Sequence, residues 1–326
     1  MNNMFENQQK TGIYNFVLSY GFYLVLLLVF IYFSIFTKNF FTLSNFINLM
    51  NAAAPLLIVA LGMALVIITR KLDISIGSIS FITTAIGSAI MVRHDVPPLL
   101  SVLAILAAGI AIGALNGFII VILKVNSFIT TLGMMFALRG LALQVTQGRI
   151  ISMPDVMNSI GKIKIGPIYL NILISLAFLL LVHLIHIRTK FGRYIVAIGS
   201  SAEVANQMGI RVKKISFTTF VLSGLFASIS GTMSMIQLGG VTSFTGVGLE
   251  FTGIAAIVIG GISLFGGVGR FIPGLLLGVY ILAMIENGLN LSGASPYIYP
   301  FVRGGIIFIA MYADSLKSKT EMTKAA

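Results

Sequence analysis

Three charged side chains lie inside stretches of sequence that are otherwise apolar. Arg139, Glu286 and Arg303 each fall in a run long enough to cross a membrane. A charge at the centre of a bilayer costs roughly 2.5–3.5 kcal/mol on insertion scales, so each should face a partner or a wet cavity. We expect Glu286 to pair with Arg303 or with Arg139. Such a pair could hold helices together or line a pore, and the sequence leaves both interpretations open.

Two further carboxylates, Asp73 and Glu250, stand where apolar runs begin. A carboxylate in the first turn of a helix is stabilised by the helix dipole, and Arg70 and Lys71 adjoin Asp73. We therefore favour a structural role for both carboxylates. A role in gating is the alternative for Asp73.

The chain lacks cysteine and the sequence motifs of several kinds of catalysis. It contains no cysteine, which excludes disulfides, thiolate metal sites and a cysteine nucleophile. It has no G-x-x-x-x-G-K-[ST] loop, so it cannot hydrolyse ATP itself, and no H-E-x-x-H or Ser/His/Asp arrangement. His183 and His186 have no nearby carboxylate and make an unconvincing metal site. We expect no catalytic residue, no metal and no cofactor.

The amino-acid composition indicates the broad class of protein. Its 326 residues are 57% hydrophobic and only 9% charged, with a mean hydropathy of +1.03. A water-soluble domain of this length could not cover itself with so few charges, which indicates an integral membrane protein. The net charge of +12 suits cytoplasmic loops rich in Lys and Arg, so no nucleic-acid partner is expected.

A helix needs roughly 20 apolar residues to cross the hydrocarbon core. Ten candidate spans fit: 16–36, 50–69, 73–92, 98–123, 127–147, 166–187, 215–238, 251–269, 271–292 and 297–313. The eighth contains GGISLFGG, which is too rich in glycine for an undisturbed helix. We expect one all-α membrane domain over residues 1–326.

The basic residues set the orientation of these spans. With both termini in the cytoplasm, fourteen of the 21 Lys and Arg residues lie inside and five outside, and Arg139 and Arg303 lie within spans. This excess on the cytoplasmic side follows the positive-inside rule. The loop 188–214, between the sixth and seventh spans, then faces the cytoplasm.

That loop holds the polar stretch GSSAEVANQMGIRVKK (199–214). Ser200 and Glu203 form the S-x-x-E capping-box pattern, and Gly209 can end the helix in a left-handed cap. At about 100° per residue, one side carries a small apolar stripe made of Ala202, Val204, Ala205 and Met208. Eight helical residues span about 12 Å, too short to cross a bilayer. The pattern predicts a short cytoplasmic helix, either a connector on the membrane surface or a docking element.

A family resemblance favours docking. Glu203, Val204 and Ala205, followed by Gly209 and Ile210, resemble the EAA-x3-G element of bacterial ABC-importer permeases. Further blocks resemble the ribose-type permeases in order: 61–79, 126–143, 191–210, 248–270 and 286–293. The resemblance runs from about residue 40 to residue 314. One departure, Thr69-Arg70-Lys71 where the ribose type usually has Gly-Gly, is similar to the autoinducer-2 branch and puts the identity of the sugar in doubt.

The resemblance implies a multi-pass permease subunit of the bacterial inner membrane that imports a monosaccharide. It implies three partners: a cytoplasmic ATPase subunit that docks on the short helix, an extracytoplasmic (periplasmic) sugar-binding protein, and a second permease subunit, identical or related. A sugar in transit needs hydroxyl, amide and aromatic groups. The candidates are Asn116, Phe128, Thr130, Thr131, Gln237, Asn287 and Asn290. Polar groups in helix bundles also serve as interhelix hydrogen bonds, which is the alternative for each.

Two other classes of function remain. An ion-coupled secondary sugar transporter would want carboxylates deep in the membrane, and Glu286 alone is plausibly deep. A membrane scaffold without transport has no positive feature in the sequence.

Overall fold

A computed structural model describes residues 24, 26–295, 297–309 and 312 of the chain. Helices dominate, and the described strands form only two short two-stranded pairs, β1 with β4 and β2 with β3. The elements are α2 (Leu43–Ile68), α3 (Ile76–Arg93), α4 (Pro98–Gly117), the π-helical turn η1 (Phe118–Ile122), α5 (Ser127–Thr146), β1 (Ile151–Ser152), α6 (Asp155–Gly161), β2 (Lys164–Ile165), β3 (Ile168–Tyr169), α7 (Leu170–Arg188), α8 (Lys190–Ser200), α9 (Ala202–Gln207), α10 (Val212–Leu238), β4 (Gly240–Val241), α11 (Leu249–Ile259), η2 (Phe271–Leu275) and α12 (Leu276–Leu291). The all-α prediction is confirmed.

Seven helices of the described chain are long and apolar enough to cross a membrane. They correspond to the second to seventh and the ninth of the ten predicted spans. Three shorter apolar helices, Leu26–Phe36, Leu249–Ile259 and Ile298–Ile309, fall on the remaining three. Residues 16–23, 25, 310, 311 and 313 of the first and last predicted spans lie outside the described residues.

The eighth span, 251–269, is not a continuous helix, as its glycine content predicts. The helix α11 ends at Ile259, and the chain then runs as a loop to η2. Within this loop Gly261, Gly266 and Gly267 have φ between +74° and +79°. This left-handed backbone suits glycine and stops a helix, so the half-length of α11 follows from the GGISLFGG stretch.

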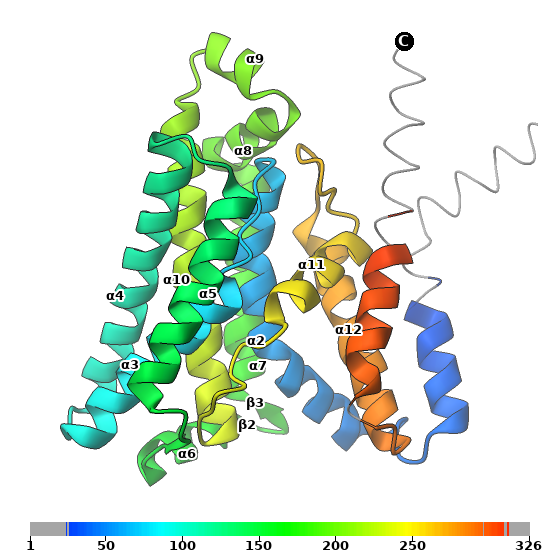
Figure 1. Ribbon diagram of the computed structural model, residues 1–326. Coiled ribbons are helices and arrows are strands. Elements are labelled where there is room, and N and C mark those ends of the chain that lie inside the picture. The colour runs from blue at the N-terminus through cyan, green and yellow to red at the C-terminus, as the bar shows by residue number, and fades with distance from the viewer. Residues whose placement is uncertain (1–23, 25, 296, 310–311, 313–326) are drawn as a thin grey trace, which may run out of the picture.

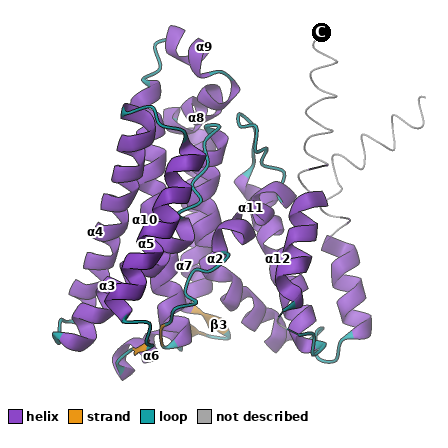
Figure 2. Cartoon of the chain, viewed as in Figure 1, coloured by secondary structure: helices purple, strands orange, loops and turns teal. Residues whose placement is uncertain are grey.

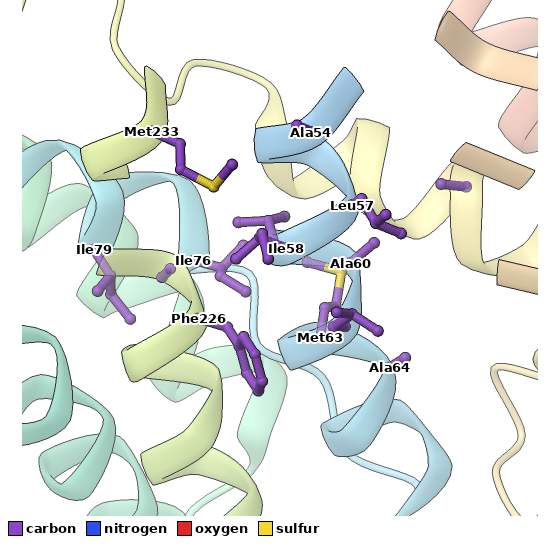
Figure 3. Close-up of a cluster of buried hydrophobic side chains, with 14 of the residues drawn as sticks. Ala54, Leu57, Ile58, Ala60, Met63, Ala64, Ile76, Ile79, Phe226 and Met233 are labelled. Atoms are coloured by element: carbon purple, nitrogen blue, oxygen red, sulfur yellow. The ribbon is translucent and has the colours of Figure 1, made fainter. Parts of the chain in front are cut away.

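The helix α2 lies at the centre of the bundle. Ile58 to Ala64 are 0% exposed, apart from Gly62, which is also buried, so this helix is apolar on every side. Figure 3 shows its side chains packed against Ile76 of α3 and Phe226 and Met233 of α10. The second half of α2, from Ala53 to Ile68, is therefore a buried helix rather than a lipid-facing one.

The helices α4 and α10 approach each other closely at two glycines. A Cβ built on Gly109 would lie 2.5 Å from the carbonyl oxygen of Gly224, which is too short for any real contact. The absence of side chains lets the two backbones touch, as is common between helices in membranes.

The two ends of the bundle differ in charge and in structure. The helices α8 and α9 project from one end, and α6 with the β2–β3 hairpin covers the other (Figures 1 and 2). The end with α8 and α9 also holds the α2–α3 and α4–α5 connections, which carry Arg70, Lys71 and Lys124. This gathering of cations is what the positive-inside rule expects of a cytoplasmic end.

Candidate functional site

The helix α9 is the most projecting element of the basic end (Figure 1). It begins after Ser201, whose hydroxyl accepts a hydrogen bond from the Val204 N–H at 3.3 Å. It closes where the Gly209 N–H donates to Asn206 and the Ile210 N–H donates to Ala205, at 3.0 and 3.1 Å. Gly209 has φ +80°, so the predicted left-handed cap is confirmed.

The predicted capping box of Ser200 and Glu203 is wrong. Ser200 is the last residue of α8, and its hydroxyl donates to the carbonyl oxygen of Val196 one turn earlier. The cap falls to the next serine, Ser201, and α9 has six residues rather than eight. The sequence also gave no sign that 190–200 is a helix of its own, although Ile195 and Ile198 are buried beneath it.

The predicted apolar stripe divides into two parts. Ala205 is buried against the rest of the protein, at 1% exposure, and anchors α9. Val204 and Met208 are 51% and 74% exposed and stand one helical turn apart on the open side. Glu203 is exposed beside them. These two apolar side chains on the projecting helix are open to contact from outside the chain.

The base of this projection packs directly on the membrane helices. A Cβ on Gly199 would collide with the carbonyl oxygen of Ile68, at the end of α2, and with the backbone of Gly267. The Gly267 N–H donates to that same Ile68 carbonyl at 3.0 Å. The Arg70 guanidinium donates to the carbonyl of Phe265 in the same loop. The end of α8, the end of α2 and the loop after α11 therefore meet at one point.

Asp73 does not open a helix as predicted. The helix α3 begins at Ile76, and Asp73 lies before it at 0% exposure. Its Oδ1 accepts from the Ser75 hydroxyl at 2.6 Å and its Oδ2 accepts from the Ser223 hydroxyl at 2.8 Å. The side chain of Asp73 thus accepts hydrogen bonds from serines rather than from Arg70 or Lys71. This carboxylate ties the α2–α3 connection to α10.

Asn116 extends the same network, since its Nδ2 donates to Ser75 Oγ at 2.9 Å. Asn116 is fully buried, and its Oδ1 has no hydrogen-bond partner among the described residues. This candidate for the sugar pathway therefore joins α4 to the α2–α3 connection. The pattern of types along the chain could not reveal a contact between residues so far apart in sequence.

Of the three charged residues predicted to lie within the membrane, two form an ion pair and the third, Arg139, contacts backbone carbonyl groups. The guanidinium of Arg303 contacts Glu286 Oε1 at 2.7 and 2.8 Å, joining the helix Ile298–Ile309 to α12. Arg139 instead donates to the carbonyl oxygens of Ser243 and Thr245, both at 3.4 Å. Of the two partners proposed for Glu286, the structure brings Arg303 to it.

Glu250 lies in the first turn of α11, as expected, and is 6% exposed. It is within electrostatic range of Arg139 and Arg303. Its Oε2 has no hydrogen-bond partner among the described residues. A Cβ on Gly77 would lie 2.5 Å from this oxygen, so the carboxylate packs on the first turn of α3.

Gln237 has a clear structural partner. Pro55 lacks an N–H, which frees the carbonyl oxygen of Asn51 one turn earlier in α2. Gln237 Nε2 donates to that carbonyl at 2.7 Å. The side-chain amide of Gln237 thereby supplies the hydrogen bond that Pro55 cannot donate within α2.

The other pathway candidates lie apart from one another. Asn287 exchanges two hydrogen bonds with Asn45 of α2, at 2.9 and 3.1 Å. Thr130 and Thr131 donate to carbonyls of their own chain segment, Asn126 and Ser127. Phe128 and Asn290 are exposed. The structure does not gather the seven candidates into one site.

Comparison with known proteins agrees with this architecture. A family model described as "Branched-chain amino acid transport system / permease component" matches residues 45–311. The ribose import permease protein RbsC of Escherichia coli (strain K12) is 36% identical over 290 residues, covering 86% of this chain and 88% of its own. The autoinducer 2 import system permease protein LsrC of Photorhabdus luminescens is 32% identical over 288 residues, covering 86% and 85%.

A third relative is the probable ABC transporter permease protein YphD of Escherichia coli (strain K12), which is 34% identical over 299 residues, covering 91% of this chain and 89% of its own. No solved structure matches the chain.

Proposed function

The chain belongs to the family of permease components of the branched-chain amino acid transport system type, and from this premise we propose that it is the membrane subunit of an ATP-driven monosaccharide importer. It is a transport component and not an enzyme. Relatives named for ribose import and for autoinducer 2 import support a sugar of that class as the transported solute. Its place is the inner membrane, and seven helices of the described residues are long and apolar enough to cross it.

The observation that carries the proposal is the exposed apolar pair on α9, Val204 and Met208. We propose that α9 docks on a cytoplasmic ATPase subunit. The Glu203-Val204-Ala205 element with Gly209 and Ile210 forms the docking segment, within the loop 188–214. We also propose that both termini lie in the cytoplasm, which the excess of Lys and Arg on that side supports.

The base of α8 supports the transmission of motion. Gly199, at the end of α8, contacts the end of α2 and the loop after α11. A displacement of α9 would therefore pass through α8 to the membrane helices without a flexible linker. ATP-driven closure of two ATPase subunits would thus move the helices that bound the sugar pathway.

We place that pathway between this chain and a second permease subunit, identical or related. The helix α5 supports this, because Ile129 and Phe136 are 65% and 66% exposed and a Cβ on Gly133 or Gly140 would meet nothing within 4 Å. Phe128, which is 48% exposed near the basic end of α5, offers an aromatic face to a sugar. The opposite end, with α6 and the β2–β3 hairpin, would receive a sugar-loaded binding protein.

The test is uptake of labelled ribose by cells or proteoliposomes that hold this permease together with its ATPase subunit and its sugar-binding protein. We expect uptake that survives a proton uncoupler and stops when ATP is depleted. Since the solute depends on the soluble receptor, the sugar that this receptor binds is measured first, and that sugar replaces ribose if the two differ.

A secondary transporter would give the opposite result, with uptake that needs the ion gradient and continues without the ATPase. That outcome, or uptake without the receptor, would contradict the proposal. A variant lacking residues 202–207 serves as the matched negative control for coupling.

A further inference from the structure

A second feature of the basic end is a cavity of about 430 Å³ between the α2–α3 connection, the α4–α5 connection and the start of α10. We call it the basic cavity. Its wall consists of Arg70, Lys71, Ile120, Val121, Lys124, Val125, Asn126, Ser127, Val212, Lys213 and Ser216. Four of these eleven residues are cations, and none of the described residues in the wall is acidic.

The cations of the basic cavity lack ion pairs that would explain their gathering. Among the described residues the one salt bridge joins Arg303 to Glu286, outside the cavity wall. Arg70 uses its Nε on the Phe265 carbonyl, a neutral group. Lys71 is half-buried, and burial lowers the pKa of its amine below the ordinary range of lysine. An anion in the cavity would offset this desolvation.

The backbone adds to the positive field. The helix α10 begins at Val212 in the wall of the cavity, and its first turn has no acidic residue and no capping side chain among the described residues. The N-terminus of this 27-residue helix presents the positive end of the helix dipole, although the Val212 N–H itself donates to the Ile210 carbonyl at 2.8 Å. Such a terminus stabilises an anion, above all a phosphate group.

A buried polar atom in the same wall lacks a partner. Ser216 lies in the second turn of α10 and is 1% exposed. Its hydroxyl has no hydrogen-bond partner among the described residues. A buried hydroxyl without a partner costs free energy, and it can donate to an oxygen of a bound anion.

We propose that the basic cavity binds a phosphate group, carried either by the headgroup of an anionic phospholipid or by a soluble phosphate compound of the cytoplasm. The cations supply charge from three segments, and Ser216 supplies a neutral donor. The bound group would link the α2–α3 and α4–α5 connections to α10, which follows α9 in the chain. The inference does not depend on which solute the chain transports.

The experiment uses the full-length permease in nanodiscs of phosphatidylcholine, in a buffer without phosphate. In one arm inorganic phosphate is titrated, and in the other phosphatidylglycerol replaces part of the lipid. The measured quantity is the midpoint temperature of unfolding. We expect a saturable rise in one arm, and the arm that responds identifies the source of the phosphate group.

Two double variants with equal loss of charge separate a built site from general surface charge. Lys71→Gln with Lys124→Gln should weaken the apparent affinity at least about tenfold, since it removes two charge-assisted contacts. Lys190→Gln with Arg193→Gln, on exposed positions of α8 outside the cavity wall, should leave the affinity unchanged. Equal weakening by both double variants, or no response in either arm, would overturn the proposal.

Ser216→Ala keeps the test decisive if the lysine variant does not fold. Alanine has nearly the volume of serine and removes only the hydroxyl. Weaker binding of the responding anion supports the site, and unchanged affinity of this variant overturns it.

Discussion

The hydroxyl of Ser223 donates to Asp73 Oδ2 at 2.8 Å, and the two residues are 150 positions apart in the chain and both fully buried. Asp73 precedes α3, and Ser223 lies in the middle of α10. The same carboxylate accepts from Ser75, which in turn accepts from Asn116 of α4. This network around one buried carboxylate thus joins α4 and α10 to the α2–α3 connection, and its hydrogen bonds satisfy a group that would otherwise be costly to bury.

Replacing Ser223 by Ala is expected to lower the free energy of unfolding by about 1–3 kcal/mol, because a buried carboxylate oxygen loses its donor. The measurement is an unfolding titration of the purified permease in mixed micelles. Ser292→Ala is the matched control, since this exposed hydroxyl bonds to its own helix and its loss should cost under about 0.5 kcal/mol. Equal stability of the two variants would contradict the role of the Asp73 network.

The sequence predicted the helices well and their contacts poorly. Hydrophobic length alone located the seven long spans, because that signal is local and strong. Hydrophobic length was insufficient at 251–269, where the residue types are apolar enough for a span, and there the glycines correctly indicated an interruption. The family blocks, including the one around Gly209, gave the class of protein.

The network of Asp73 shows why the site could be predicted only in part. Asp73 looked like a first-turn carboxylate because its sequence neighbours are cations, whereas its real partner Ser223 comes from a distant helix. The cap of α9 lies at Ser201 and not at Ser200 because Ser200 is the last residue of α8, a helix that the sequence pattern did not predict. Both errors concern where an element stops, which depends on tertiary contacts as well as on residue type.

The ion pair of Glu286 and Arg303 gives a second prediction. Both side chains are about one third exposed, at 34% and 27%, which weakens the pair relative to a buried one. Glu286→Gln should therefore cost about 1 kcal/mol of stability and reduce the amount of permease in the membrane. The check is membrane abundance and transport measured side by side.

A double-mutant cycle identifies the partner of Glu286. Combined with Arg303→Gln, the Glu286→Gln change should show a coupling energy of about 0.5–1 kcal/mol, and combined with Arg139→Gln it should show none. Coupling to Arg139 would be inconsistent with the observed pair. Normal abundance with lost transport would assign Glu286 to the pore instead of to helix packing.

The contact of Gly199 with the end of α2 gives the third prediction. Gly199→Ala has no room for its methyl group, which would collide with the Ile68 carbonyl and the Gly267 backbone. We expect α8 to shift outward, so that ATP-driven uptake falls at least about tenfold while insertion persists. Gly304→Ala, at a helical glycine with open space around it, should behave as the parent chain. Normal uptake by Gly199→Ala would show that this contact transmits nothing.

The last prediction concerns Met208, on the exposed side of α9. It distinguishes a role in docking the ATPase subunit from a role in the folding of this chain. Met208 is 74% exposed, so Met208→Ser removes little buried surface within this chain and should leave its stability within about 0.5 kcal/mol. If the ATPase subunit covers this side chain, the same change loses apolar contact in the complex, and ATP hydrolysis stimulated by the loaded receptor should fall several-fold. Met208→Leu keeps the apolar volume and should retain the stimulated ATP hydrolysis.

The stability of the permease and the stimulated hydrolysis are measured on the same preparations. Loss of both in Met208→Ser would point to a role in folding, whereas hydrolysis that is equal in the Ser and Leu variants would mean that the partner does not touch this face of α9.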